Sequence, residues 1–367
     1  MQGKAVPIGQ KEHRGGTGIF HQPRCRKTGC KRRACAPDPC EEGYHALLQT
    51  LYRCILGKHL CHGSHGKRSK YLGLHSHAAE NEIGDEAAHR YAASGTPAAL
   101  YACGGDGTLN ELVQGAAGSA NVAVGCVPCG SGNDYVRNFG AAGQAPFLDF
   151  AAQLQAQPCR VDLLQTSLGI GIDICAAGLD AQVAYGIPKF RRLPGCGGTA
   201  AYTLSILQAM LSRFGHKLRV AIDGKEYTGT YMMAAICNGG YYGGGYQAAP
   251  YAAMDDGLLD IVLVKPISRI QVAGILAKYK AGRHMQDADT IVPEFRSFMT
   301  FYRARSVEMQ VLDNRPIIAT IDGECAPVME LKAEVLPSAL NVLLPRPACG
   351  SAVIRGLHEC PMQTKAK

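Results

Sequence analysis

The sequence predicts an α/β domain built on a parallel sheet, followed by a second, mainly antiparallel domain of the β-sandwich kind. One change of pattern and the length of the chain support this prediction. Strands and helices alternate through about Phe147, and from Val161 the pattern changes to short β-branched runs. A chain of 367 residues also exceeds a typical single hydrophobic core. We therefore expect two domains, with the active site in the cleft between them.

The first strand–turn–helix unit starts with the short apolar run 97–103, which is typical of a buried parallel strand. The turn that follows is Gly104-Gly105-Asp106-Gly107-Thr108, and residues 109–115 have the pattern of the first turns of a helix. Glycines in such a turn let backbone N–H groups approach an anion, and the helix N-terminus adds a favourable dipole. A carboxylate beside phosphates is repulsive unless it orients a metal ion or a metal-bound water. The unit therefore predicts a phosphate-binding turn.

The second unit repeats this arrangement. Residues 122–128 have the pattern of a buried strand, and Gly130-Ser131-Gly132-Asn133-Asp134 leads into a helix that we expect to continue through Phe139. Consecutive units of this kind place both turns at the carboxyl edge of one sheet, where open α/β sheets bind ligands. Taken alone, Asn133-Asp134 would be interpreted as a helix N-cap. Next to the first turn, a role in ligand binding is favoured.

The second domain is expected to contain one clear helix among its strands. We predict the helix over residues 201–213 and strands over 218–222, 228–236 and 261–264. Several further motifs lie among these elements. They are Gly178-Leu179-Asp180-Ala181, Gly198-Thr199-Ala200-Ala201-Tyr202, Asn238-Gly239-Gly240-Tyr241-Tyr242-Gly243-Gly244-Gly245, Asp255-Asp256-Gly257-Leu258 and Ile321-Asp322-Gly323-Glu324.

In order and spacing, these motifs resemble the diacylglycerol kinase catalytic-domain family, which includes bacterial soluble lipid kinases and is related to the sphingosine and ceramide kinases. The resemblance covers roughly residues 86–345. It implies that the first domain is similar to that of NAD kinase and that a last strand, 339–344, returns to it. The implied division is an atypical segment 1–85, a nucleotide-binding domain 86–147 plus about 335–348, and a lipid-substrate domain 148–334.

The resemblance implies an ATP-dependent and Mg²⁺-dependent kinase acting on a lipid hydroxyl, with diacylglycerol as the default acceptor and phosphatidic acid as the product. Such a reaction needs phosphate positioning, a divalent cation and a group that accepts the hydroxyl proton. By resemblance, Asp322 is the general base, and Asp106 and Asp134 hold Mg²⁺, partly through water. The residues implied to bind the nucleotide are Gly104, Gly105, Asp106, Gly107, Thr108, Asn110, Gly130, Ser131, Asn133, Asp134 and Glu324. Without the family pattern, Asp322-Gly323 would be interpreted as a plain hairpin turn.

A second ion site is implied on the loop around Asp256. There the Asp256 carboxylate and the carbonyls of Ala253 and Leu258 would hold a structural Mg²⁺, since hard oxygen ligands suit that ion. A solvated acidic turn before a strand is an equally weighted interpretation.

The amino-terminal quarter does not follow the family pattern. Residues 1–90 carry fifteen Lys and Arg against eight Asp and Glu, so seven of the eight units of net positive charge lie there. Cysteines recur at every fifth position from Cys25 to Cys40, without the Cys-x-x-Cys pairs of common zinc sites. A zinc module, a basic arm for anionic lipid or nucleic acid, and a non-native or disordered segment remain as alternatives. The loss of hydrophobic periodicity favours the last.

The expected setting is cytoplasmic, with weak and reversible membrane contact. No apolar run is long enough to cross a bilayer, and the first residues lack a signal-peptide core. The ten later cysteines have the scatter of core residues in a reducing compartment. Tyr241, Tyr242, Tyr246 and Tyr251 are candidates for a lipid-facing mouth, although packing in a β-domain core explains them nearly as well. We expect ATP and a lipid at the membrane surface as partners and no nucleic acid, and a homodimer is left open.

Two other functions remain as alternatives. NAD kinase has a similar Gly-Gly-Asp-Gly-Thr turn and would phosphorylate a soluble dinucleotide, but the late Asp322-Gly323-Glu324 motif favours the lipid kinase. A catalytically impaired lipid or nucleotide sensor is motivated by the missing amino-terminal phosphate loop.

For the lipid kinase itself, phosphatidylglycerol, sphingoid bases and long-chain polyprenols are alternative acceptors to diacylglycerol.

Overall fold

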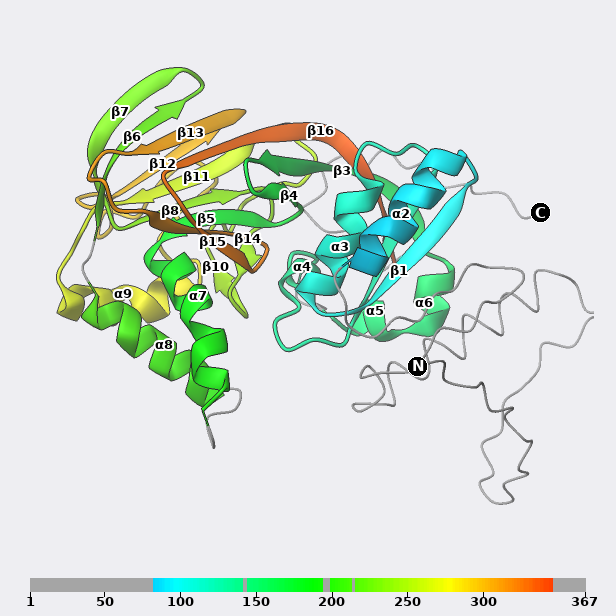
Figure 1. Ribbon diagram of the computed structural model, residues 1–367, viewed down its shortest axis with the longest axis horizontal. Helices are drawn as coiled ribbons and strands as arrows, with labels where there is room; N and C mark the ends of the chain where they lie inside the picture. Colours follow the sequence, from blue (N-terminus) through cyan, green and yellow to red (C-terminus); the bar gives the residue numbers. More distant parts are fainter. Residues whose placement is uncertain (1–81, 141–143, 194–198, 213–214, 346–367) are drawn as a thin grey trace, which may run out of the picture.

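The computed structural model describes residues 82–140, 144–193, 199–212 and 215–345. These residues form two lobes that are joined by one long strand, β16 (Glu330–Leu344), which runs from the second lobe back into the first (Figure 1). The first lobe contains α2 (Glu82–Ser94), β1 (Ala98–Gly104), α3 (Asp106–Ala116), β2 (Val122–Pro128), α4 (Asp134–Arg137), α5 (Ala145–Leu148), α6 (Phe150–Leu154) and β3 (Gln157–Thr166).

A parallel arrangement forms the centre of the first lobe, as predicted. Strands β1 and β2 pair in parallel from Ala98 opposite Val122 to Gly104 opposite Pro128. The far end of β16 joins this sheet in parallel with β2, at Asn341 opposite Ala123. The predicted return of the last strand to the first domain is therefore confirmed. The core beneath the sheet consists of apolar side chains from α3, β2 and β16, among them Leu109, Val113, Val122, Val124, Leu340 and Val342.

Two sheets face each other in the second lobe. One is antiparallel throughout, in the order β12-β11-β8-β5-β14-β15, and the other continues from β16 through β13 and β6 to β7. The strands not yet given bounds are β4 (Gly169–Gly171), β5 (Ile174–Gly178), β6 (His216–Ile222), β7 (Lys225–Tyr231), β8 (Met233–Cys237), β9 (Tyr241–Tyr242), β10 (Tyr246–Gln247), β11 (Leu259–Val264), β12 (Met299–Ala304), β13 (Ser306–Val311), β14 (Ile317–Ile321) and β15 (Glu324–Val328). Alternate residues of both sheets, such as Leu218, Val220, Leu259 and Ile261, share one buried core, as in a sandwich. The predicted fold class is thus confirmed.

Some predicted elements have different bounds. The run 228–236 forms parts of two strands rather than one. The strand is interrupted at Met232, whose backbone N–H donates to the Val264 carbonyl. Helix α8 (Thr199–Leu211) begins and ends two residues before the predicted helix, and α4 ends at Arg137 rather than at Phe139. The sequence pattern missed two more helices, α7 (Leu179–Arg191) and α9 (Arg269–Lys280). Pro188 and Gly186 interrupt the helical pattern of α7, and only Val272 and Tyr279 of α9 are buried, so neither helix has a clear apolar stripe.

Most of the atypical segment 1–85 lies outside the described residues, including its six cysteines and the alternatives raised for it. Helix α2 starts at Glu82, packs against α3 and buries Ala88. Among the described residues, no helix is both long and apolar enough to cross a membrane.

Candidate active site

The two glycine turns interlock at the carboxyl ends of β1 and β2. The backbone N–H groups of Cys129 and Gly130 donate to the Gly104 carbonyl at 2.8 and 3.2 Å. A Cβ atom placed on Gly130 would overlap the Gly105 backbone, so this close approach requires glycine. The turns are therefore one structural unit, with Thr108 and Ser131 exposed on it where phosphate donors are expected.

Asp106 and Asp134 are brought together by this unit. The backbone N–H of Asp134 donates to Asp106 Oδ1 at 2.7 Å. The Asp134 carboxylate then accepts N–H bonds from Gly244 and Gly245, each at 2.8 Å, and lies 3.4 Å from Arg137 Nε. Burial raises the pKa of Asp134 to about 6, although the two glycine N–H donors oppose the shift. The run Gly243-Gly244-Gly245 thus holds a site carboxylate through two of its backbone N–H groups.

Asp322 lies in the two-residue turn that joins β14 to β15. Its φ is 45° and that of Gly323 is 101°, so both residues adopt the left-handed conformation of a tight hairpin. The hairpin interpretation therefore holds for the backbone. At the same time, the carboxylate reaches to the start of β5, where Oδ1 accepts N–H bonds from Asp173 at 3.1 Å and Ile174 at 2.9 Å. Oδ2 accepts from the Ile172 N–H at 2.7 Å.

Asn110 connects the first glycine turn to this hairpin. Its amide Nδ2 donates to Asp322 Oδ2 at 3.3 Å and to the Ile170 carbonyl at 3.1 Å, while Oδ1 accepts from Gln114. Asn133 similarly bonds to both the N–H and the carbonyl of Gly130. Both amides were expected to contact the nucleotide. In the structure they hold the turns and the hairpin in register, and their contact with the nucleotide stays a prediction.

The Asp322 carboxylate has four donors in all, which fills the acceptor positions of its two oxygens. Burial raises the pKa of Asp322, and the backbone N–H bonds oppose that shift. Glu324, two residues on, is exposed at the start of β15. The hairpin therefore presents one anchored carboxylate and one at the surface.

Two further carboxylates belong to this region, and the sequence prediction did not include either of them. Asp173 is only 5% exposed, and Asn138 Nδ2 donates to it at 2.8 Å. Burial and then the neighbouring Asp322 hold the pKa of Asp173 well above its ordinary value. Burial, together with Glu324 and Asp85, raises the pKa of Glu111 to about 7. A carboxylate directly before the apolar run 174–177 was the available signal for Asp173, and the Asn110-Glu111 pair was the signal for Glu111.

The predicted second ion site contains a cation from the chain itself. Arg303 Nη2 lies 2.6 Å from Asp256 Oδ2, and Arg303 Nε lies 3.0 Å from Asp260 Oδ1. The other oxygen of Asp256 accepts the Leu258 N–H at 3.1 Å. The guanidinium thus supplies the positive charge at the position where Mg²⁺ is expected. The role of Ala253, Asp256 and Leu258 as metal ligands stays a prediction.

The residues at the glycine turns suit a nucleotide with its divalent cation. Within the described ranges, no three or more His, Cys, Asp and Glu side chains form a ready metal-binding group. However, Asp106 Oδ2 faces the Gly132 backbone at the mouth of the turns, beside Asp134 Oδ2, and carboxylate oxygens are the ligands that Mg²⁺ prefers. Asp106 would hold the cation directly or through water, with Asp134 fixed behind it by its glycine clamp.

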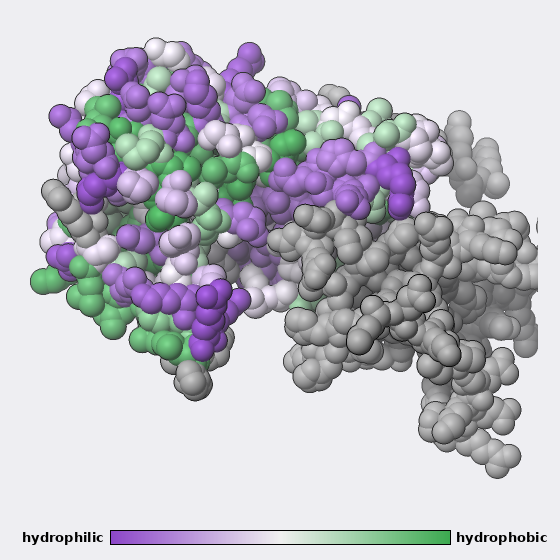
Figure 2. Space-filling view, in the orientation of Figure 1, coloured by the Kyte–Doolittle hydropathy of each residue, from purple (hydrophilic) through white to green (hydrophobic). Residues whose placement is uncertain are grey.

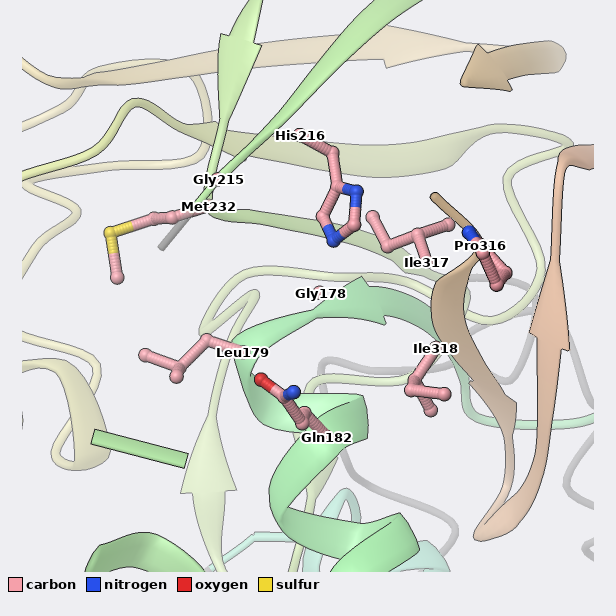
Figure 3. A pocket seen from close by; sticks show the side chains of 9 residues that line it. All are labelled: Gly178, Leu179, Gln182, Gly215, His216, Met232, Pro316, Ile317 and Ile318. Carbon is pink, nitrogen blue, oxygen red and sulfur yellow. The ribbon is translucent and has the colours of Figure 1, made fainter. Parts of the chain in front are cut away.

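Most of the tyrosines predicted to face the lipid are packed inside the second lobe. Tyr242 and Tyr246 pack against a second buried cluster of the second lobe, which includes Met233, Cys237 and Ala249. The Tyr242 hydroxyl lies 3.2 Å from that of Tyr279. Tyr251 alone of the four is largely exposed. A separate small pocket lies between the start of α7 and the ends of β6 and β14, with His216 facing Gln182 across it (Figure 3). None of the predicted site residues lines this pocket.

Comparison with known proteins agrees with the motifs. Residues 67–166 match the diacylglycerol kinase catalytic domain, and residues 173–344 match the YegS C-terminal NAD kinase β-sandwich-like domain. The match to the catalytic domain begins at residue 67, nineteen residues before residue 86, where the resemblance found from the sequence begins. A protein of Shewanella frigidimarina described as a probable lipid kinase YegS-like is 30% identical over 67% of this chain and 76% of its own length. The diacylglycerol kinase of Bacillus subtilis is 23% identical over 67% of this chain and 78% of its own.

Solved structures show the same fold. A putative diacylglycerol kinase from Bacillus anthracis superposes with a TM-score of 0.57 at 17% identity, covering 82% of this chain and 91% of that one. The order of motifs, their convergence in one site and these matches together establish that the chain belongs to the diacylglycerol kinase catalytic-domain family of lipid kinases.

Proposed function

We propose that the protein transfers the γ-phosphate of ATP to the hydroxyl of a membrane lipid, most simply of diacylglycerol, to give phosphatidic acid. One observation supports this most strongly. Hydrogen bonds join four motifs that lie far apart in the sequence: Asp134 to Asp106, Gly244 to Asp134, and Asn110 to Asp322. Phosphoryl transfer depends on positioning and charge stabilisation, and a connected set of turns and carboxylates at a sheet edge supplies both.

Each part of the site has a proposed task. The N–H groups and hydroxyls of the interlocked turns, with Thr108 and Ser131 in front, bind the phosphates. Asp106 and Asp134 hold Mg²⁺, which when bound neutralises charge on the transferring phosphate. The hairpin carboxylates take the proton of the lipid hydroxyl. Asp322 is the base that the resemblance implies, and to act it must release one donor, of which the Asn110 amide at 3.3 Å is the longest. Glu324 is the exposed alternative on the same hairpin.

The test is incubation of the purified protein with radiolabelled ATP, Mg²⁺ and mixed micelles of single candidate lipids, with soluble NAD in a parallel reaction. We expect label in phosphatidic acid and none in the dinucleotide. Asp322→Asn and Glu324→Gln serve as variants, with binding of a fluorescent ATP analogue as a readout that does not need turnover. Label in NADP would favour the NAD kinase alternative. Nucleotide binding without any labelled product would support the sensor.

A further inference from the structure

Large hydrophobic side chains that remain exposed gather on one part of the second lobe. Eight such side chains occur among the described residues, and five of them lie on the α7–α8 hairpin or in the first turn of α9: Tyr185, Leu193, Leu207, Leu211 and Ile270. Single exposed apolar residues need no explanation, but a group on adjoining helices does. Figure 2 shows hydrophobic side chains along the lower left margin, where Figure 1 places α8 and α9.

Specific contacts hold these side chains together. Leu207 and Leu211 are one helical turn apart and so share a face of α8. Arg269 then donates to the carbonyls of Met210 and Ser212, at 2.6 and 3.0 Å, which lie on either side of Leu211. This places Ile270, 85% exposed, at the end of α8 near Leu211, which is 72% exposed. The guanidinium also satisfies the last carbonyls of α8, where a cation is favourable.

Basic side chains predominate around this face. Residues 181–212 contain Lys189, Arg191 and Arg192 and no Asp or Glu, and α9 contains Arg269, Lys278 and Lys280, of which Lys278 is paired with Glu294. At the end of α7, Lys189, Arg191 and Arg192 are exposed next to Leu193. Apolar side chains bordered mainly by cations are the composition of an element that lies in an anionic membrane interface.

The face is also connected to the candidate active site. Helix α7 follows β5 directly, and the first residue of β5, Ile174, donates its N–H to Asp322. The same helix packs against β14 and β15, whose turn contains Asp322. A surface that contacts lipid through α7 and α8 would therefore stand beside the hairpin that is proposed to act on the lipid hydroxyl.

We propose that the face formed by α7, α8 and the first turn of α9 docks on an anionic lipid bilayer. The leucines and Ile270 enter the boundary between headgroups and acyl chains, and the arginines at the end of α7 contact lipid phosphates. This differs from the tyrosine mouth expected from the sequence. The inference rests on the proposed lipid kinase activity only for the reason why the protein would dock on a membrane. Its test is independent of that activity, because vesicle binding is measured without ATP and without turnover.

The experiment is co-sedimentation of the full chain with phosphatidylcholine vesicles that contain increasing fractions of phosphatidylglycerol, at low and high salt. We expect binding to rise with the anionic fraction and to fall with salt. Leu207→Ser with Leu211→Ser weakens binding by about tenfold or more, because two large apolar side chains no longer leave water. Arg191→Ser with Arg192→Ser weakens it by about tenfold or more and flattens the salt dependence. Met329→Ser and the pair Lys217→Ser with Arg219→Ser, on exposed positions elsewhere in the second lobe, are matched controls that leave binding unchanged.

Two readouts separate this inference from the proposed function. All variants should keep the wild-type melting temperature and phosphorylate a short-chain diacylglycerol dispersed as monomers, and only the Leu207/Leu211 and Arg191/Arg192 variants should lose activity on vesicles. Wild-type protein that fails to sediment with any vesicle, or helix variants that sediment like the controls, would overturn the docking face even if the lipid is phosphorylated. If no lipid is phosphorylated but the helix variants still lose vesicle binding, the docking face holds and the kinase assignment fails.

Discussion

Asp322→Asn is predicted to destabilise the protein as well as to abolish turnover. The carboxylate accepts four donors, three of them backbone N–H groups of residues 172–174. An asparagine offers one acceptor oxygen, and its NH₂ group must face donors that it cannot satisfy. If the new oxygen keeps the bonds to Asp173 and Ile174, the Ile172 N–H is left buried without a partner. That costs about 1–3 kcal/mol, which for a domain of this size lowers the melting temperature by roughly 2–12 °C.

Differential scanning calorimetry on Asp322→Asn, Glu324→Gln and wild type measures this effect. Glu324 is exposed, so its amide variant should melt within about 1 °C of wild type. Loss of turnover in Glu324→Gln, with the melting temperature and binding of the ATP analogue unchanged, would favour Glu324 as the proton acceptor. An Asp322→Asn protein that melts like wild type would refute the reasoning, since the Ile172 N–H would then have found another acceptor at no cost.

Three other substitutions test separate parts of the structure. Gly130→Ala should weaken binding of an ATP analogue and lower the free energy of unfolding by about 1–3 kcal/mol, because the new Cβ overlaps the Gly105 backbone. The control Gly274→Ala, in open space on α9, should be neutral or stabilising. Equal urea midpoints for the two variants would contradict this prediction. Arg303→Met should lower the free energy of unfolding by about 3–5 kcal/mol, because it removes the partner of two nearly buried carboxylates. Added Mg²⁺ should restore part of that stability. The control Lys278→Met, which breaks a half-exposed ion pair, should lower it by at most about 1 kcal/mol. The pKa of Glu111 is raised to about 7 in the folded state, so its contribution favours folding at low pH and is lost as pH rises from the unfolded value through about 7. Glu111→Gln should therefore gain about 1–2 kcal/mol on wild type between about pH 5 and pH 8, after allowance for its partial exposure, and a pH-independent difference in urea unfolding would count against the shift.

The sequence was sufficient where local signals agree with the fold. The strand over 122–128 and both glycine turns are where the pattern predicts them, because buried parallel strands are short apolar runs and only glycine allows the turns to touch. Helix α7 was missed because Pro188 and Gly186 contradict a helix locally. The structure shows what outweighs them: Gly186 lets Ser205 of α8 approach, and its hydroxyl donates to the Val183 carbonyl. For α9, the Ser268–Gln271 capping box was a usable signal, but the weak apolar stripe hid it.

What the sequence could not supply is the pairing among polar groups of the site. Asn110 and Asp322 are 212 positions apart, and Asp134 and Gly244 are 110 apart, so no local pattern indicates that they bond. The pairing also changes what each residue can do. Asn110 and Asn133 bond to the backbone and Asp322, whereas the side chains of Thr108 and Ser131 are exposed at the turns.

The same pairing explains how the site tolerates its charge. Burial raises the pKa of Asp134 and of Asp173, and neighbouring carboxylates add to both shifts: Asp106 for Asp134, and Asp322, Asp106 and Asp134 for Asp173. Backbone N–H groups oppose this for Asp134 and Asp322, but for Asp173 the opposing bond is the Asn138 side-chain amide alone. Fixed donors stabilise the anionic form of a buried carboxylate without mobile counter-ions, so backbone N–H groups limit the rise in the pKa of Asp134 and Asp322, whereas the pKa of Asp173 lies well above its ordinary value. A site arranged in this way is short of positive charge until a cation arrives, which is the electrostatic reason to expect a divalent metal to accompany the nucleotide.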